Sequence, residues 1–363
     1  MTESTIIERL LRLPVKGITD ARCPWSPGSV RDFYSEADYW WPDPANPSGP
    51  FIKRDGESNP ACFNRHRKLL IRMSCQCAAL TSVWLKNGGA PLLERIQSIL
   101  DTWFVDESTS MRPSLSYSQS IRGRCEGRSF GVIDTIQLCE VALSIQALRT
   151  ALPRKLYEGV LQWFTQYLEW LVTSEFGRTE RKAKNNHGVC WYLQAACFAR
   201  LTGNEALLDE LRQDFRCILL KQIERNGAMP RELARTKPYG YALFTLEVFA
   251  GLAVLLGTTS ENCFLWREGD SGSVADAMAF LYPYILDKKA WPYPPDVLFF
   301  DYWPCRQSAL LLVGHHTGER KYRALWDKLP PWRLKFELLR NFPVRTPELW
   351  LPQLSMNNSQ VMS

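Results

Sequence analysis

Histidine is scarce in this chain, and several features that mark common protein classes are missing. Only 4 of the 363 residues are histidines, and the 11 cysteines form no CxxC pairs, which argues against a structural zinc site. No apolar run approaches the roughly 18 residues that a membrane span requires. The N-terminus, MTESTIIERLLRLPVKG, lacks the continuous apolar stretch of a signal peptide. We therefore expect no metal, no membrane partner and a cytoplasmic location, or a secreted one if the native N-terminus differs.

The chain also lacks a large excess of either positive or negative charge. The chain has 44 Lys and Arg against 38 Asp and Glu, a net charge of +6, with no concentrated basic stripe. This argues against a nucleic-acid partner, whereas a mild positive bias favours an anionic substrate. A hydrophobic content of 45% excludes wholesale disorder, and the aromatic content of 12% suits a cleft for sugar rings, although most rings belong to the core. Nothing here predicts the oligomeric state.

Prolines and glycines interrupt the sequence up to about residue 62, and a helical pattern of apolar residues begins at about residue 63. CPWSPGS, YWWPDPANPSGP and RDGESNP break helices and strands alike, but Tyr39, Trp40 and Trp41 in a row do not resemble a linker. We expect residues 1–62 to form an ordered, irregular cleft wall. Helical periodicity then predicts helices over 67–86, 90–104, 131–148, 154–174, 188–202, 205–225, 241–256, 273–286 and 306–316.

Two of these helices, 131–148 and 241–256, are apolar on more than one side, which is typical of helices buried between two layers. No run of alternating strands is convincing, so we predict an all-α chain. A single α/α toroid, an incomplete α/α barrel over residues 63–330, accommodates such layers. Residues 331–363 would form a C-terminal helix and tail. A helical-repeat solenoid is the alternative, but no repeat of fixed period is visible.

The first candidate site is Asn185-Asn186-His187, which opens a predicted helix. A helix cap followed by an ordinary histidine explains one asparagine, but not two adjacent amides and an imidazole. The three residues place donors and a titratable ring at a positively polarised helix end, where a carboxylate binds well.

The second candidate is the segment PRELARTKPYGYAL, residues 230–243. Its three cations, Arg231, Arg235 and Lys237, and its two tyrosines, Tyr239 and Tyr241, cluster just before the most apolar helix. A solvated surface loop is the default interpretation of such a run. However, a phenolate is favoured near an arginine and a lysine, so either tyrosine is a candidate for proton transfer.

With these residues in view, the chain resembles the alginate-lyase-type polysaccharide lyases, α/α-toroid enzymes that cleave uronate polymers by β-elimination. Six segments carry the resemblance in family order over roughly residues 38 to 250. They are DYWWPDP, RDGESNP, TWFVDESTSMRPSLSYSQ, GRSFGVIDT, NNHG and PRELARTKPYGYALFTLE.

The resemblance implies a set of roles and no cofactor. Asn186, His187 and Arg235 would neutralise the substrate carboxylate, and Tyr241, six residues after Arg235 in the tyrosine position that opens the next helix, would transfer the proton. Preorganised donors of this kind are worth about 3–4 kcal/mol each. The further residues expected to bind substrate are Asn185, Tyr39, Trp40, Trp41, Tyr117, Gln119, Arg128, Arg231, Lys237 and Tyr239.

The chain also departs from the family pattern. Arg112, Ser114 and Ser116 stand where relatives commonly carry asparagines, and SIRGRCEG adds Arg122 and Arg124. WPYPPDV replaces the usual glutamine-containing ending. These departures are expected to alter the substrate rather than the elimination apparatus.

Three functions follow from the sequence. The first is a lyase that cleaves a uronate-containing polysaccharide or oligosaccharide of the alginate, mannuronan or glucuronan type. The second is an intracellular biosynthetic enzyme on the same scaffold, which eliminates, dehydrates or cyclises a small carboxylate- or carbonyl-bearing metabolite. The third is an inactive binding module, which the joint presence of Asn186, His187, Arg235 and Tyr241 argues against.

Overall fold

The computed structural model describes residues 3–331 and 335–351, and its contacts divide the chain into two compact units. The first unit is Met1–Arg54, Ser58–Thr179 and Glu348–Ser363, and the second is Asp55–Glu57 and Glu180–Pro347. These boundaries differ from those of the predicted parts, so the division at 62 and 330 stays a prediction. Residues 332–334 and 352–363 of the predicted C-terminal helix and tail lie outside the described residues.

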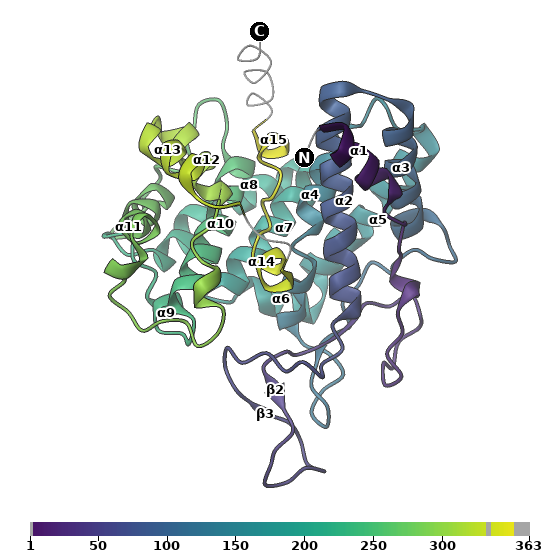
Figure 1. The fold of residues 1–363 in the computed structure, drawn as a ribbon, viewed down its shortest axis with the longest axis horizontal. Coiled ribbons are helices and arrows are strands. Elements are labelled where there is room, and N and C mark those ends of the chain that lie inside the picture. The colour runs from purple at the N-terminus through teal and green to yellow at the C-terminus, as the bar shows by residue number, and fades with distance from the viewer. Residues whose placement is uncertain (1–2, 332–334, 352–363) are drawn as a thin grey trace. The chain divides into compact units, whose positions relative to one another are not determined.

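The first unit is built around the long helix α2 (Arg65–Asn87), which packs against α3 (Ala90–Leu100) and α4 (Leu138–Ala147) (Figure 1). Gly88 and Gly89 have positive φ angles and separate α2 from α3. The other helices of this unit are α1 (Glu3–Arg12), α5 (Arg154–Thr173) and α15 (Pro347–Trp350). Helix α1 lies within the segment 1–62 that we expected to be irregular.

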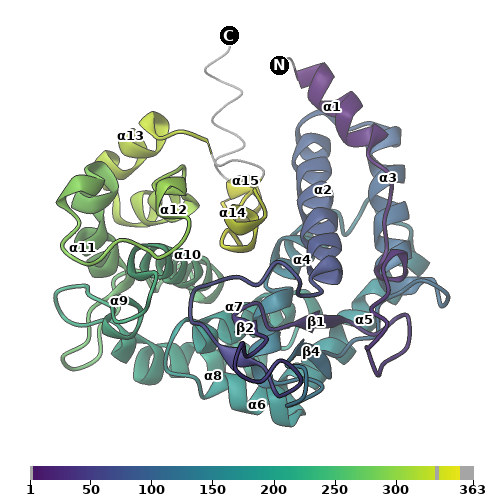
Figure 2. The same ribbon diagram turned by 60° about the horizontal axis from the view of Figure 1, so that its bottom comes forward.

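Four short strands occur among the described residues, although the sequence predicted none. β1 (Tyr34–Glu36) pairs in parallel with β4 (Tyr117–Ser120) (Figure 2). β2 (Trp40–Trp41) pairs antiparallel with β3 (Ile52–Lys53) (Figure 1). Strands of two to four residues are too short to show an alternating pattern in a sequence. The β2–β3 pair therefore gives the proline-rich segment an ordered hairpin.

The second unit is arranged around α10 (Pro238–Leu256), which packs against α7 (Asn186–Thr202) and α12 (Ser308–Thr317) (Figure 1). α6 (Glu175–Arg181) is the helix at which the chain passes from the first unit to the second. The remaining helices of the second unit are α8 (Glu205–Asp214), α9 (Pro230–Leu233), α11 (Val274–Leu286), α13 (Arg320–Lys328) and α14 (Phe336–Arg340).

Helix α10 corrects the expectation that no apolar run approaches the length of a membrane span. It has 19 residues with a mean hydropathy of 1.7, which is long and apolar enough to cross a membrane. The helices Ser129–Thr135 and Leu138–Ala147, which are bent against each other, also reach this length and hydropathy if they are taken as one span. However, 83% of the apolar window of α10 is buried within the protein. A core helix satisfies the same criteria, so this is weak evidence for a membrane span.

The long predicted helices agree with the structure, but one charged stretch does not lie where its pattern indicates. His66 lies among Arg65, Arg67 and Lys68, a pattern typical of a solvated helix face. Instead His66 is 3% exposed, its Nδ1 accepts the Tyr34 N–H at 3.0 Å, and its Nε2 lies 2.8 Å from the Ala21 carbonyl. Burial lowers the pKa of its imidazole. His66 is therefore a structural residue of the first unit.

Candidate active site

The site begins at the N-terminus of α7, where three neighbouring residues have different tasks. Asn185 is the N-cap, and its side-chain oxygen accepts the backbone N–H of His187 at 3.2 Å. Position 188 requires glycine, because a Cβ there would lie 2.0 Å from the Ala183 carbonyl oxygen. The motif NNHG thus fixes the start of the helix, and the side chain of Asn185 is used in the cap.

Asn186 is held by a buried carboxylate from α9. Glu232 accepts the backbone N–H of Asn186 at 2.7 Å through Oε1 and its side-chain Nδ2 at 2.7 Å through Oε2. Because a carboxylate only accepts, the amide nitrogen must point toward Glu232. Glu232 is 2% exposed, and burial raises its pKa although the two bonds from Asn186 oppose the shift. Asn186 itself is 1% exposed.

His187 is held by a second buried carboxylate. Its Nδ1 lies 2.5 Å from Oε1 of Glu180, whose side chain is 3% exposed, while 17% of the His187 side chain is exposed. Since an ionised carboxylate cannot donate, the hydrogen of this contact belongs to Nδ1. Any hydrogen bond between the ring and a substrate is therefore made through Nε2.

Arg235 lies between a carboxylate and the phenol of Tyr241. Its Nη2 donates to Oδ1 of Asp55 at 3.0 Å and to the Tyr241 hydroxyl at 3.1 Å, and its Nε donates to Oδ2 of Asp55 at 3.2 Å. The guanidinium carbon also lies 4.2 Å from the centroid of the Tyr241 ring. Burial opposes the charge, but Tyr241 and Asp55 outweigh it and raise the pKa of Arg235.

The α7 residues and the Arg235–Tyr241 pair are brought together by Glu232. Besides binding Asn186, this carboxylate lies close enough to Arg235 and His187 for their charges to counteract the rise in its pKa. The amide of Asn186 therefore binds this buried carboxylate, the charges of His187 and Arg235 act on it, and the phenol of Tyr241 contacts Arg235. This is an arrangement of donors and one proton-transfer group suited to an anionic ligand.

The other residues predicted in segment 230–243 lie in different environments. Arg231 is exposed. Lys237 is 5% exposed, and its Nζ binds Oε1 of Glu337 on α14 at 3.1 Å. Tyr239 is fully buried against Trp291, and its hydroxyl donates to the carbonyl of Tyr284 at 2.9 Å. Burial raises the pKa of Tyr239 far above its usual range. Burial of the ring does not favour contact with a substrate, and the predicted substrate-binding role of Tyr239 stays a prediction.

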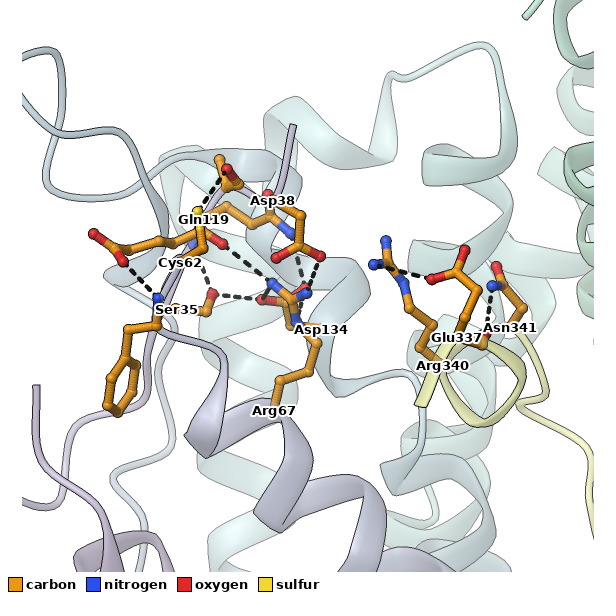
Figure 3. A network of polar contacts seen from close by, with 12 residues as sticks. Ser35, Asp38, Cys62, Arg67, Gln119, Asp134, Glu337, Arg340 and Asn341 are labelled. Carbon is orange, nitrogen blue, oxygen red and sulfur yellow. Dashed lines mark hydrogen bonds and ion pairs between the residues drawn. The ribbon is translucent and has the colours of Figure 1, made fainter. Parts of the chain in front are cut away.

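The first unit has a polar network of its own (Figure 3). Buried Arg67 pairs with Asp38, with 2.6 Å between Nη1 and Oδ2, and with Asp134, with 3.0 Å between Nε and Oδ1. Gln119 joins this network because its Nε2 donates to Oδ1 of Asp134 at 2.9 Å and its backbone N–H donates to the Ser35 hydroxyl at 2.8 Å. These bonds hold Gln119 at a φ of 53°, in the left-handed region.

Gln119 in turn positions Arg128. The Gln119 carbonyl accepts from Nε of Arg128 at 3.0 Å, and its Oε1 accepts from Nη2 at 3.1 Å. Tyr117 in β4 is half-buried, and its ring packs on Gly28, where a Cβ would lie 2.6 Å from Cε2 of the ring. Tyr39, Trp40 and Trp41 are half-buried at and beside the hairpin. Their substrate contacts stay predictions.

Sequence reasoning missed three carboxylates that hold the candidate residues. Glu180, Glu232 and Asp55 are not among the site residues that the sequence predicts. The position of Glu232, three residues before Arg235 in RELAR, is a usable signal because the Arg235 backbone N–H donates to the Glu232 carbonyl and closes a turn between them. No local pattern connects Glu180 or Asp55 to the site. Among residues 3–331 and 335–351, no group of three or more His, Cys, Asp or Glu side chains suits a metal ion.

Comparisons with known proteins place this geometry in a family. A search of curated proteins finds no match. Among solved structures, an alginate lyase from Bacteroides ovatus is similar with a TM-score of 0.83 and 29% identity, over 95% of this chain and 90% of that one. A histidine-to-alanine variant of alginate lyase A1-III with bound tetrasaccharide matches with a TM-score of 0.57 and 14% identity, over 92% and 87% of the two chains.

A tyrosine-to-phenylalanine variant of alginate lyase A1-III, also with a tetrasaccharide, matches with a TM-score of 0.52 and 16% identity, over 84% of this chain and 80% of that one. These likenesses and the helical elements confirm the all-α fold class of the α/α-toroid type. The sequence model of the alginate lyase family matches residues 18–291, three quarters of the chain. The chain therefore belongs to the alginate lyase family and is a polysaccharide lyase, an enzyme of the carbon–oxygen lyase class.

Proposed function

We propose that the protein cleaves a uronate-containing polysaccharide or oligosaccharide, of the alginate, mannuronan or glucuronan type, by β-elimination. The observation that carries the proposal is the 3.1 Å contact between Arg235 and the Tyr241 hydroxyl, beside the Asn186–His187 pair and connected to it through Glu232. The bound tetrasaccharides of two similar structures support a carbohydrate substrate.

In the proposed reaction Tyr241 is the proton-transfer group. As a phenolate, stabilised by the adjacent guanidinium of Arg235, it takes the hydrogen from C5 of the uronate. The electron pair of the broken C–H bond forms the C4–C5 double bond, and the C4–O4 bond breaks. The departing O4 then receives the proton from the Tyr241 hydroxyl, which gives a syn elimination if the sugar is mannuronate or glucuronate. Acid–base transfer of this kind contributes about 10²–10⁴-fold.

The remaining residues stabilise the charge that develops on the uronate carboxylate. Proton removal from C5 places negative charge on the carboxylate oxygens, so donors there lower the barrier. The direct contacts are made by Nε2 of His187, which donates when both ring nitrogens carry a hydrogen, and by the guanidinium of Arg235. Asn186 is almost fully covered and already binds Glu232, so its second amide hydrogen makes the least direct contribution of the three.

The test is the ultraviolet absorbance of the unsaturated uronate that elimination produces. The protein is mixed with alginate, polymannuronate, glucuronan and their oligomers, and a rise with at least one is expected. Tyr241→Phe should lose 10²-fold or more of the rate. The matched control is Tyr239→Phe, which removes a hydroxyl two residues away that binds a backbone carbonyl. No absorbance rise with any of these substrates, or equal rates for both variants, contradicts the proposal.

A further inference from the structure

A second candidate for ligand binding lies wholly within the first unit, on the β2–β3 hairpin. Trp40 and Trp41 are successive residues of β2, so their rings point to opposite faces of the strand pair. Trp40 is opposite Lys53, and Trp41 is opposite Ile52. Each ring is half-buried and approached by arginine.

On the Trp40 face two guanidinium groups approach one ring. The guanidinium carbon of Arg124 lies 5.0 Å from the Trp40 centroid, and that of Arg128 lies 6.0 Å from it. Arg128 also lies 4.6 Å from the centroid of Phe130. A guanidinium over an aromatic ring keeps its planar face on the ring, so its N–H edges point sideways, the direction in which it binds acid groups.

Arg124 differs from nearby Arg122 because no carboxylate among residues 3–331 and 335–351 pairs with it. Arg122 pairs through its Nε and Nη2 with both oxygens of buried Glu36, so its charge is compensated. Arg124 is exposed, and its Nε donates to the backbone carbonyl of Phe51 at 2.8 Å. Within the described part of the chain Arg124 pairs with no carboxylate. Its charge is therefore available to an anion from solution.

The two arginines are also held in place before any ligand arrives. Gln119 binds Arg128 through two acceptors, and Asp134 fixes the amide of Gln119 with its oxygen toward Arg128. Arg124 lies in a tight turn closed by the pairing of Ile121 and Cys125. In that turn, Gly123 has a φ of 73°, and a Cβ there would lie 3.4 Å from Cα of Pro50. Such preorganisation lowers the entropy cost of binding.

We propose that Arg124 and Arg128, positioned by Trp40, form a binding subsite for the carboxylate of an acidic sugar in a polysaccharide chain. The inference rests on the proposed function and deepens it, because a second carboxylate site favours a chain that carries more than one acidic sugar. Trp40 orients the two guanidinium groups, and their N–H edges donate to the carboxylate oxygens.

The experiment measures binding without cleavage. Full-length protein carrying Tyr241→Phe is titrated calorimetrically with alginate oligosaccharides of two to eight sugars, and with β-1,4-linked mannan oligosaccharides as the neutral counterpart. Adding Arg124→Gln is expected to weaken binding of the longer acidic chains about threefold to tenfold. A loss of this size lies between the contribution of an exposed ion pair and that of a hydrogen bond to a charged group. Trp40→Leu is expected to act in the same direction, and high salt should remove the difference.

The matched control is Arg154→Gln, which removes one positive charge from a side chain that is 90% exposed on α5 and paired with Glu158. It should leave the affinity unchanged, and Arg124→Lys should restore only part of it, since lysine lacks the forked donors. The subsite is refuted if Arg124→Gln binds acidic chains as tightly as its parent. Turnover of the same chains by the unmodified protein tests the proposed function separately. Tight binding that depends on Arg124, without turnover, contradicts only the elimination.

Discussion

Asp55 offers the sharpest test of how Arg235 works. Its carboxylate binds Nε and Nη2 of Arg235 at 3.2 and 3.0 Å and also accepts the Thr236 hydroxyl at 3.0 Å. Asp55→Asn preserves the shape of the side chain but removes its charge and one of the two acceptors for Arg235. If Arg235 acts on Tyr241, the guanidinium then loses the anchor that holds Nη2 beside the phenol. The rate of turnover should fall, with little change in KM.

The expected magnitude follows from the exposure of the pair. A hydrogen bond to a charged group contributes about 1.5–3 kcal/mol when buried. The side chains of Arg235 and Asp55 are 25% and 23% exposed, so solvent screening reduces this to about 1–2 kcal/mol. At about 1.4 kcal/mol per tenfold change, kcat should fall roughly fivefold to thirtyfold. Steady-state kinetics on the best uronate substrate measure it, and thermal unfolding shows whether the fold is retained.

The opposite assignment for Arg235 predicts a different result. If Arg235 mainly binds the substrate carboxylate, Asp55 competes with the substrate, and Asp55→Asn should lower KM while kcat is kept. The control is Glu57→Gln, which removes one negative charge from an exposed residue of the same turn. An unchanged kcat in Asp55→Asn, with Glu57→Gln behaving alike, refutes the view that Asp55 positions Arg235 against Tyr241.

Three further outcomes are expected. Glu232→Gln should reduce kcat about tenfold to a hundredfold with the helical circular dichroism retained, because one of two acceptors for Asn186 becomes a donor. Gly188→Ala should lower the free energy of unfolding by about 1–3 kcal/mol in denaturant titrations, since its Cβ would meet the Ala183 carbonyl at 2.0 Å. Burial raises the pKa of Asp296 to about 6, so stability should fall as the pH rises from about 4 to 6, by about 1–2 kcal/mol, and Asp296→Asn should flatten that dependence.

The helices were predictable because a long apolar stripe is a local property. Periodicity located α2, α5, α7 and α10 to within a few residues, and Gly88 and Gly89 marked a break between two helices. Local reasoning does not reveal the burial of Arg67 and His66, because a run of neighbouring charges usually indicates a solvent-exposed helix face. Arg67 is buried with Asp38 and Asp134, which are 29 and 67 residues away. A buried charge depends on such partners, and local sequence does not name them.

In the candidate site, too, the residues with a local sequence pattern were predictable and those that depend on distant partners were not. Asn186 and His187 at a helix start, and Arg235 and Tyr241 six residues apart, were recognisable from spacing and from the family resemblance. Asp55 is 180 residues from Arg235 in the chain, and Glu180 reaches His187 across the turn that precedes α7. Tyr239 and Tyr241 also differ in orientation along α10, which places the first ring in the core and the second on Arg235. This favours Tyr241, whose role in proton transfer stays a prediction.

The carboxylates have a consequence for how the protein meets an anionic chain. His187, Arg235 and Lys237 are each paired with one of them, Glu180, Asp55 or Glu337. The pairs fix the geometry of the donors but cancel much of their field beyond a few ångströms, so long-range attraction must come from elsewhere. Arg54 on Trp41 and Arg124 on Trp40 are candidates, since neither pairs with a carboxylate among the described residues. Capture and chemistry would then rest on different arginines, and salt should raise KM far more than it lowers kcat.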